Sequence, residues 1–573
     1  MTDTVSVQGL PLGISSFTKI RDNNQLYVDK THFIKKLEDL QFFYAFIVRP
    51  RRFGKTLFTN ILEAYYDKYQ ADDFTRHFTG TYIGQNKTSE QGQYYVLHLD
   101  LSALTSNDLI RAFNSQLTSA FKNFFERYPV DGYQQFLDSD PGYPAEYIGE
   151  FFDFVKPLVK NRLYLIIDEY DQFANNILAN DPETFRDVTR DDGPVKNFYA
   201  QIKKYTRTDQ VSRIFITGVT TISLDSMTSG FSIAEDISHN VFFTDMFGFT
   251  EAELRTLIQT SLKNNDNLSM NEEEIFARMK DCYNGYRFSE DSDITVFNSE
   301  ACVYYLRSMQ LQGKEPKPLT VRSIGTDTDK MERILALSDS GFVKETVKKV
   351  ITGEAIDFDG FSDNLNLNEK AMLNHTDTLS VLFYMGYLTL STHSAAELVC
   401  PNKSMESQFI SYYLNKIEGY SSFKVGDLRA KEIIQSMHRG DIRPLFSFVS
   451  AKLHPGTGVN AHRKLNESNI QTGIKAVVNI TTDYRAYDET EAQGIGFTDL
   501  LLVPLKKTAP SYLIELKHVK PAEKSESVVQ QKLNDAKAQL DRYAAAENLK
   551  SVQHLVKVAA VFSNFELMAM ESY

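Results

Sequence analysis

Short runs of apolar residues, each ending abruptly at a polar or glycine position, recur in the first 250 residues. The runs cover residues 42–48, 163–167 and 213–217, and longer stretches with apolar residues at helical spacing separate them. Runs of this length and composition are typical of buried strands. Because buried strands alternate here with helical segments, the pattern predicts a parallel α/β sheet.

A different pattern begins near residue 445. A helical segment that starts at Glu467 is followed by two strand-like runs, 499–505 and 511–518, and then by another helical segment. The turn between the two runs contains a proline, so a β-hairpin is the simplest interpretation. The sequence therefore predicts a separate C-terminal α/β domain.

Composition and charge narrow the classes of function. Apolar residues make up 42% and charged residues 24% of the 573 residues, as in globular proteins. The net charge of −13 excludes a surface that is basic throughout, so any nucleic-acid site must be a local groove. The three cysteines lie far apart, which argues against a disulfide framework or a zinc ribbon. With neither a signal-peptide pattern nor an apolar stretch of membrane-spanning length, we expect a soluble, cytoplasmic protein that does not engage a membrane.

The loop after the first apolar run carries the chemistry of a phosphate-binding loop. Gly54 allows close approach of the backbone, Lys55 can reach the β- and γ-phosphates of ATP, and Thr56 can bind Mg²⁺. The full motif has glycine six residues before the lysine, where this chain has Arg49. A basic turn that caps a helix is the alternative, but the position between a strand and an amphipathic helix favours nucleotide binding.

The second apolar run ends in Asp168 and Glu169, as in the strand that supplies the acids of an ATPase site. Asp168 would hold Mg²⁺, and Glu169 would polarise the attacking water. Thr217, which ends the third run, would contact the γ-phosphate. Polar residues that merely end strands are the alternative. The phosphate-loop sequence upstream favours the ATP-binding interpretation.

The C-terminal hairpin carries two carboxylates and a lysine. Strand alternation places Glu515 and Lys517 on one face, and hairpin pairing can bring Asp499 next to Glu515. The two carboxylates would bind Mg²⁺ or Mn²⁺, while the lysine would orient a water and stabilise negative charge at phosphorus. These groups predict metal-assisted hydrolysis of a phosphodiester. A surface ion-pair cluster is the alternative.

Residues around the hairpin extend this prediction. Glu467 would be a further catalytic carboxylate, although an acid favoured by the helix dipole fits equally well. Gln539 and Tyr543 share one face of the following helix, for which packing is the favoured interpretation. Lys506 and Lys507 make the turn basic, so we expect them to line a groove for the phosphate backbone. A charged edge strand that discourages aggregation would look similar.

These motifs resemble those of bacterial proteins that join an N-terminal AAA-ATPase-like domain to a C-terminal PD-(D/E)xK nuclease-superfamily domain. The resemblance covers nearly the whole chain, and its most specific segment is RPRRFGKT at residues 49–56. Other matching segments are LPLGI (10–14), YVDKT (27–31), IIDEYD (166–171), FGFT (247–250), YNGYRF (283–288), PNK (401–403), TD (498–499) and IELK (514–517). Members of the family tend to carry arginine where Arg49 stands.

The resemblance implies roles for residues and boundaries for domains. It maps Lys55 and Thr56 to Walker A, Asp168 and Glu169 to Walker B, and Asp499, Glu515, Lys517 and Glu467 to the nuclease core. The implied domains are an AAA-like (ASCE-like) P-loop domain (1–248), a helical lid (249–327), a mostly helical middle region (328–444) and a PD-(D/E)xK nuclease-like domain (445–573).

The sequence thus predicts a Mg²⁺-dependent nuclease in which an ATP-binding AAA-like module gates or positions nucleic acid, with DNA favoured over RNA. A nucleotide-dependent, non-catalytic scaffold or effector that binds nucleic acid or protein is the alternative, and an ATPase that acts on protein partners is a third. Because both acids and the lysine are present, the enzyme is favoured. Some relatives act as toxins or as effectors delivered into host cells. Delivery, oligomeric state and hydrolysis of ATP stay open, and a bacterial cytoplasmic location is expected.

Overall fold

The computed structural model describes seven ranges of the chain: residues 8–172, 193–221, 234–316, 328–362, 372–417, 427–453 and 467–573. Within them, positions 103, 105–107, 264, 266–267, 482, 493–494, 506–507 and 565 are not described, and residue 319 is described outside them. Lys506 and Lys507, predicted to line a groove, therefore lie outside the described residues. The chain divides into two compact units, which we treat separately. The first takes Met1–Pro316, Arg322–Phe342 and Asp357–Pro401, and the second takes Lys317–Val321, Val343–Ile356 and Asn402–Tyr573.

The first unit is built around a five-stranded sheet with the strand order β2-β3-β4-β1-β5, in which every pairing is parallel. The strands are β1 Tyr44–Val48, β2 Tyr95–Asp100, β3 Leu163–Asp168, β4 Val211–Gly218 and β5 Glu235–Asp236. Three of them are the predicted apolar runs. Strands β3 and β4 are buried along nearly their whole length, as expected when helices cover both faces of a parallel sheet.

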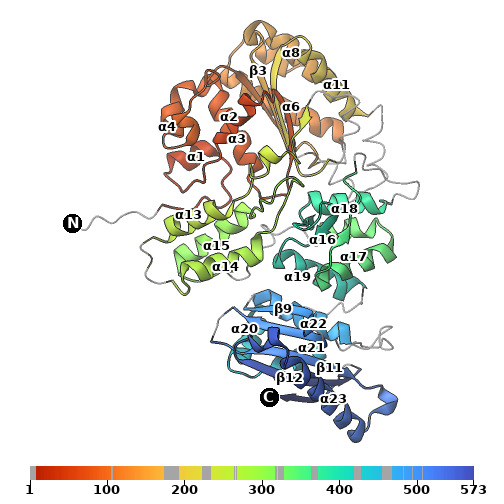
Figure 1. The fold of residues 1–573 in the computed structure, drawn as a ribbon. Helices are drawn as coiled ribbons and strands as arrows, with labels where there is room; N and C mark the ends of the chain where they lie inside the picture. Colours follow the sequence, from red (N-terminus) through yellow and green to blue (C-terminus); the bar gives the residue numbers. More distant parts are fainter. Residues whose placement is uncertain are drawn as a thin grey trace, which may run out of the picture. The chain divides into compact units, whose positions relative to one another are not determined.

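Helices lie on both faces of this sheet, with α3 on one face and α6, α8 and α11 on the other (Figure 1). Helix α6 turns the face that carries Phe113, Leu117, Phe121 and Phe124 inward, at the spacing of an amphipathic helix. The helices up to this point are α1 Phe17–Asp22, α2 His32–Asp39, α3 Lys55–Tyr66, η1 Lys68–Asp73, α4 Phe74–Phe78, α5 Tyr82–Gln85, α6 Leu109–Arg127, α7 Tyr133–Leu137, α8 Pro144–Val159, α11 Pro194–Thr206 and η2 Val241–Phe243.

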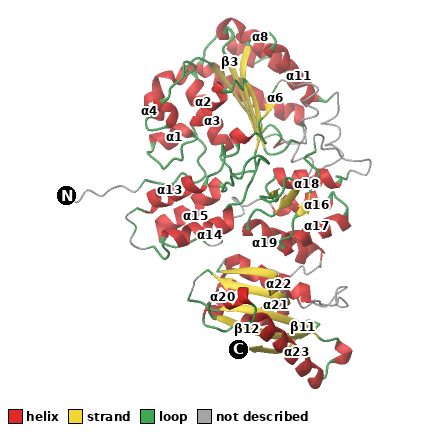
Figure 2. Cartoon of the chain, in the orientation of Figure 1, coloured by secondary structure: helices red, strands yellow, loops and turns green. Residues whose placement is uncertain are grey.

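Three helices follow the sheet, where a helical lid is predicted: α13 Glu251–Leu262, α14 Glu272–Tyr283 and α15 Ser299–Gln312 (Figure 2). Each begins at a residue whose side chain caps the first turn, namely Thr250, Asn271 and Asn298. Such caps satisfy backbone N–H groups that have no partner within the helix. The sequence therefore fixes where each of these helices begins.

The middle of the chain is mainly helical and also contains short strands. Strands β7 and β8 pair in antiparallel fashion. The elements are α16 Thr328–Ala336, α17 Ser340–Thr352, β6 Ile356–Asp357, α18 His375–Tyr384, β7 Thr389–Leu390, β8 Glu397–Val399, α19 Lys403–Tyr412, the π-helical turn η3 Tyr413–Ile417 and α20 Asp427–His438. Both compact units take residues from this region. The four-part division of the chain stays a prediction.

The second unit contains a mixed five-stranded sheet with the order β13-β12-β11-β10-β9. The predicted hairpin forms its centre, because β10 and β11 pair in antiparallel fashion. Helix α23 crosses over from β11 to the parallel strand β12 and packs against both. The elements are α21 Arg443–Leu453, α22 Glu467–Thr481, β9 Tyr484–Ala492, β10 Gly496–Pro504, β11 Ser511–His518, η5 Pro521–Glu523, α23 Glu526–Ala544, α24 Glu547–Lys550, β12 Leu555–Ser563 and β13 Glu566–Ser572.

The predicted fold class is confirmed: a parallel-sheet α/β domain comes first, helices follow, and an α/β domain with a mixed sheet comes last. Across the described residues, no helix is both long enough and apolar enough to cross a membrane.

Gly285 offers a test of packing between the lid and the middle region. Its φ is +94°, and a Cβ added there would lie 2.0 Å from the backbone oxygen of Pro401. We expect Gly285→Ala to lower the free energy of unfolding of the first unit by more than about 2 kcal/mol, because backbone strain adds to the clash. The control is Gly132→Ala, with φ of +82° and nothing within 4 Å, which carries only the strain. Equal melting temperatures of the two variants would contradict the packing.

Candidate functional site

The first candidate site lies where β1 leads into α3. Gly54 caps α3 in the left-handed conformation, with φ of 97°, and this turns the loop into the helix. The Lys55 side chain is buried, and its Nζ donates to the backbone oxygens of Arg49 at 3.0 Å and Pro50 at 3.1 Å. The loop therefore curls around its own lysine, as a phosphate-binding loop does.

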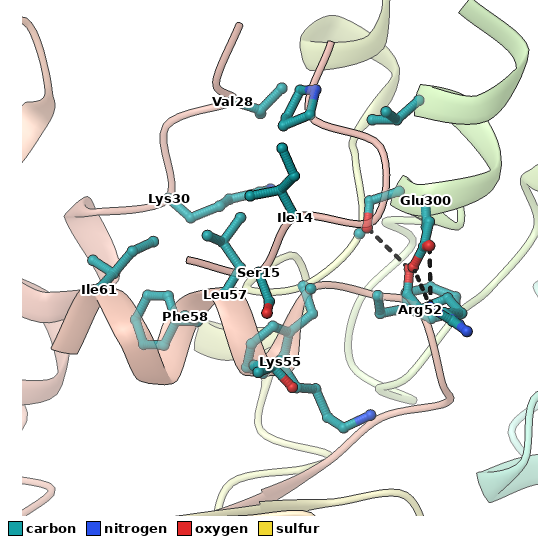
Figure 3. A pocket seen from close by; sticks show the side chains of 18 of the residues that line it. Ile14, Ser15, Val28, Lys30, Arg52, Lys55, Leu57, Phe58, Ile61 and Glu300 are labelled. Atoms are coloured by element: carbon teal, nitrogen blue, oxygen red, sulfur yellow. Dashed lines mark hydrogen bonds and ion pairs between the residues drawn. The ribbon is translucent and has the colours of Figure 1, made fainter. Parts of the chain in front are cut away.

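A cavity of about 530 Å³ opens beside this loop. Its polar lining includes Gly54, Lys55, Thr56, Asp168 and Glu169, which are five of the predicted ATP-site residues. Apolar side chains line another part, among them Ile14, Val28, Leu57, Phe58 and Ile61 (Figure 3). Polar groups suited to phosphates and an apolar wall thus share one cavity.

Asp168, the last residue of β3, and Glu169, which follows it, both line the cavity. Burial raises the pKa of Asp168, and a hydrogen bond from Thr56 and the charge of Lys55 oppose that rise. Burial also raises the pKa of Glu169, whose backbone has φ of 53° and donates from its N–H to Asp168 at 3.0 Å. A cation in the cavity would be stabilised by both carboxylates, and Thr56 and Asp168 are the groups placed to hold it.

Two cavity residues escaped the sequence reasoning, and one predicted residue lies elsewhere. Asp100, which ends β2, pairs in register with Asp168, and Ser102 follows it. The sequence signal for Asp100 is the run Tyr95–Asp100, an apolar strand that ends in an acid. Thr217 is buried at the end of β4, is not part of the cavity lining, and its hydroxyl finds no partner among the described residues. Its contact with a phosphate stays a prediction.

Arg49 has a structural role at the position where the standard motif has glycine. Its guanidinium is buried, donates to the backbone oxygens of Val48, Ser238 and Phe243, and lies 4.3 Å over the Phe288 ring. Burial lowers the pKa of Arg49 to about 9. Arg49 does not line the cavity. Its hydrogen bonds instead tie the start of the loop to the residues that follow β5.

Helix α15, which lies in the predicted lid, contacts the loop from another direction. The N-terminus of α15 lies against Arg52, since Ser299 Oγ and the Glu300 N–H both donate to the Arg52 backbone oxygen at 3.1 and 3.2 Å. The Glu300 carboxylate also pairs with the Arg52 guanidinium at 3.1 Å (Figure 3). This half-exposed pair places one cationic side chain of the loop beside the cavity mouth.

The second candidate site lies at the centre of the C-terminal sheet. The pairing of Leu500 with Ile514 places Asp499 opposite Glu515. Asp499 Oδ2 accepts a hydrogen bond of 2.6 Å from the Leu516 N–H, which fixes that carboxylate across the two strands. The strand register therefore brings Asp499 and Glu515 together, as the hairpin predicted.

Glu515 and Lys517 lie on the same face of β11 and form an ion pair of 2.7 Å between Nζ and Oε1. Glu515 is only 3% exposed, and its Oε2 finds no hydrogen-bond partner among the described residues. Burial, and then the charge of Asp499, raise the pKa of Glu515. Burial opposes the charge on Lys517, but the bond to Glu515 outweighs it and raises the pKa of Lys517. A buried carboxylate oxygen without a partner is what a divalent cation would satisfy.

Glu467 begins α22 and lies near the end of β11. Burial raises its pKa, while the charge of Lys517 and the backbone N–H of His518 lower it. The predicted set of Glu467, Asp499, Glu515 and Lys517 therefore shares one region. Among described residues, however, no three His, Cys, Asp or Glu side chains converge as a metal site. The residues fit a cation held by Asp499 and Glu515, with Glu467 nearby.

Tyr543 also approaches these groups. Burial and the charge of Glu515 raise its pKa. Its ring lies so close to β10 that a Cβ on Gly496 would be 3.0 Å from Tyr543 Cε1. Gln539, one turn earlier, has a buried side-chain oxygen without a partner in the described part of the chain. The face of α23 that carries Gln539 and Tyr543, for which the sequence favoured a packing role, thus brings Tyr543 close to the carboxylates.

Two family models match the parts of the chain that contain the two candidate sites. Residues 11–228 match the AAA-ATPase-like family described as "Predicted AAA-ATPase", and residues 465–572 match a family of the PD-(D/E)XK nuclease superfamily. The first match contains the phosphate-binding loop, and the second contains the carboxylates and the lysine. The resemblance seen in the sequence is thereby confirmed.

Individual relatives extend over part of the chain. A protein of Azotobacter chroococcum mcd 1, described as uncharacterized and encoded in the vnfD 5′ region, is 25% identical over 298 residues. The match spans 51% of this chain and 51% of that protein, so the chain spans about half the length of this curated relative. A Walker-type ATPase of Pyrococcus abyssi has a similar solved structure, with TM-score 0.38 and 14% identity over 67% of this chain and 96% of that one. Such values are too low to transfer its activity.

The raised pKa of Glu515 predicts a pH-dependent effect of Glu515→Gln without divalent metal. A carboxyl whose folded pKa exceeds the ordinary 4.5 favours folding in its protonated form, so this contribution is lost as pH rises through the folded value. We therefore expect the glutamine variant to gain stability relative to the parent between pH 4 and pH 8, measured as melting temperature in a chelating buffer.

The control is Glu566→Gln, which removes a carboxylate that is 67% exposed and paired with Lys524. Its stability relative to the parent should change little over the same pH range, because exposed pairs contribute little. In the parent, Mg²⁺ at 100 times its dissociation constant should add about 2.7 kcal/mol. A glutamine variant that loses relative stability as pH rises, or that Mg²⁺ stabilises as strongly, would contradict this description of the site.

Proposed function

We propose that this chain, in which an AAA-ATPase-like domain is joined to a PD-(D/E)XK nuclease-superfamily domain, is a metal-dependent nuclease whose ATP-binding domain gates or positions the substrate. The observation that carries the proposal is the group of Asp499, Glu515 and Lys517 on one face of a central hairpin. Glu515 Oε2 is buried there without a partner among the described residues.

The chain's own residues divide the work at this site. Asp499 and Glu515 would hold a divalent cation, Mg²⁺ or Mn²⁺, which when bound supplies charge stabilisation and lowers the pKa of a water. Asp499 is held in place by the Leu516 N–H. Lys517 keeps its proton, because its pKa is raised, and so acts by orienting a nucleophile and by stabilising negative charge at phosphorus. Glu467 is placed to accept a proton, since burial raises its pKa.

The ATP-binding part of the proposal rests on the 530 Å³ cavity. Lys55 would exchange its bonds to two backbone oxygens for bonds to phosphate oxygens, and the Gly54 loop would supply N–H groups. Thr56 and Asp168 would hold Mg²⁺, Glu169 would polarise the attacking water, and Thr217 would contact the γ-phosphate. The apolar wall would accept the base. The cavity lining, which does not include Thr217, and the family match of residues 11–228 support these roles.

Nucleic acid, with DNA favoured, is the proposed substrate, and the bacterial cytoplasm is the proposed location. The proposed domains are the ones predicted from the sequence: a P-loop domain (1–248), a lid (249–327), a middle region (328–444) and a nuclease domain (445–573). The alternative is a nucleotide-dependent scaffold or effector that binds without cleaving. The presence of both acids and the lysine favours the enzyme.

The first test is cleavage of single-stranded and double-stranded DNA and RNA by the purified full chain in Mg²⁺ or Mn²⁺. We expect Asp499→Asn and Lys517→Met each to lower the cleavage rate by at least about 100-fold, as loss of a transition-state contact does. The matched control is Lys431→Met on α20, whose side chain is exposed and belongs to neither candidate site, so the rate should stay nearly unchanged. Nucleic acid that is bound but never cut would favour the scaffold.

The ATP-binding domain has its own test. We expect Lys55→Ala to weaken ATP binding about 10- to 100-fold, as loss of a charged hydrogen bond predicts. Glu169→Gln should retain binding and slow any ATP hydrolysis by at least about 100-fold, because the group that polarises water is lost. Binding is measured by calorimetry and turnover by phosphate release. Unchanged turnover in the Glu169 variant would refute the role given to Glu169.

A further inference from the structure

Two aromatic side chains stand exposed on the edge hairpin next to the carboxylates. Phe497 on β10 is 60% exposed, and Tyr487 on β9 is 44% exposed. Ile495, which precedes β10, is 45% exposed. The core of this unit buries other large apolar side chains, such as Tyr512, almost completely. Large apolar side chains left in solvent beside a candidate site are groups that a ligand can contact.

The strand register places both rings on the face that carries the catalytic group. Phe497 precedes Asp499 by two residues on β10, so both side chains leave the same face, about 7 Å apart along the strand. Tyr487 pairs with Leu501, which lies on that face as well. The two rings therefore lie on either side of Asp499 along the direction of β10.

The charges around the rings differ on the two flanks of the carboxylates. On the β9 flank, the exposed Glu491 pairs directly with Phe497. On the β11 flank, Lys517 is followed by Lys520 and Lys524, whose side chains are 76% and 37% exposed and pair with Glu523 and Glu566. Because exposed ion pairs are weak, a phosphate backbone can displace these acids from the lysines, whereas Glu491 repels it. A neutral base can lie beside Glu491, whereas a second sugar-phosphate strand cannot do so without cost.

We propose that Phe497, assisted by Tyr487, stacks on unpaired bases, so that the C-terminal domain selects single-stranded nucleic acid or unpaired ends over continuous duplex. This inference rests on the proposed nuclease function and specifies its substrate. One backbone follows the lysine flank while its bases turn toward the aromatic flank, which is how proteins bind single strands through stacking on aromatic rings. In a duplex the bases are already stacked on each other, and their faces are not available.

The test uses the absence of tryptophan from this chain. Phe497→Trp introduces the sole tryptophan, whose emission a stacked base quenches. The full-length variant is titrated in a chelating buffer, where no cleavage is needed, with a 20-nucleotide single strand and with the blunt duplex of the same sequence. We expect saturable quenching by the single strand and little change with the duplex. The control is Phe242→Trp, at an exposed position of the first unit that should not respond.

Affinity and cleavage provide the second readout. Stacking on one ring is worth roughly a 5- to 100-fold change in affinity, so Phe497→Ala should weaken single-strand binding by that factor and leave duplex binding unchanged. Phe497→Tyr should retain binding, because it keeps the ring. The ratio of kcat/KM for single strand over duplex should fall in the alanine variant in parallel.

The outcomes separate this inference from the nuclease proposal. Two outcomes overturn the stacking role and leave the nuclease proposal intact. One is cleavage of duplex with no change of emission in Phe497→Trp. The other is an equal loss of affinity for single strand and duplex in Phe497→Ala. Quenching by the single strand without any cleavage supports stacking and contradicts the proposed nuclease activity. A change of emission with protein concentration alone overturns the inference in favour of contact with a second copy of the chain.

Discussion

Burial of charged groups is the constraint on which both candidate sites depend. Taking a charge out of water costs several kcal/mol unless a partner compensates it. The first unit meets this cost for Arg49 and Lys55 with backbone oxygens, most of them from the loop itself or from the chain after β5. The second unit meets it for Glu515 with Lys517, but only at one of the two carboxylate oxygens. In both places we propose that a ligand changes this compensation: a phosphate would replace the backbone oxygens at Lys55, and a cation would complete the partners of Glu515.

The buried arginine also explains how the phosphate-binding loop is held without glycine at its start. Arg49 contacts Phe288, and a Cβ on Gly386 would lie 2.9 Å from Pro50 Cβ. His239, one residue after an acceptor of Arg49, bonds through Nδ1 to the Phe288 backbone oxygen at 2.9 Å. The start of the loop is therefore packed against three segments that are distant in sequence. Any change in the loop on nucleotide binding must be accommodated by those segments as well.

The parts of the fold that the sequence predicts are those governed by local patterns. Strands β1, β3 and β4 are continuous apolar runs, and the hairpin of β10 and β11 is marked by two such runs around a turn. The sheet edges were missed: β2 has His98 within it, and β9 and β13 carry charged residues because edge strands are partly exposed. The interior strand β12, Leu555–Ser563, was missed as well, although it is mostly apolar. The acid at the end of β2, Asp100, was missed together with its strand.

The same distinction applies to the sites. Gly54, Lys55 and the acids of β3 are recognisable because a short motif carries their chemistry, and Asp499 with Glu515 because hairpin pairing is a local rule. The role of Arg49 was not predictable, since its acceptors Ser238 and Phe243 lie 189 and 194 residues away. Tyr543 looked like a packing residue because periodicity alone cannot distinguish a helix face over a core from one over a site. Exposure of Phe497 was equally invisible, as an aromatic residue in a strand is buried in most proteins.

How a protein with a net charge of −13 would bind a polyanion follows from the arrangement of these groups. The lysines beside the carboxylates are each paired with an acid, so long-range attraction is weak and affinity must come from short-range contacts. Aromatic stacking supplies such contacts without positive charge, and it operates only on bases that are not already stacked. The acidic composition thus weakens the attraction for duplex, and the exposed rings add affinity for unpaired bases alone. For the proposed nuclease, that combination means weak binding to continuous duplex.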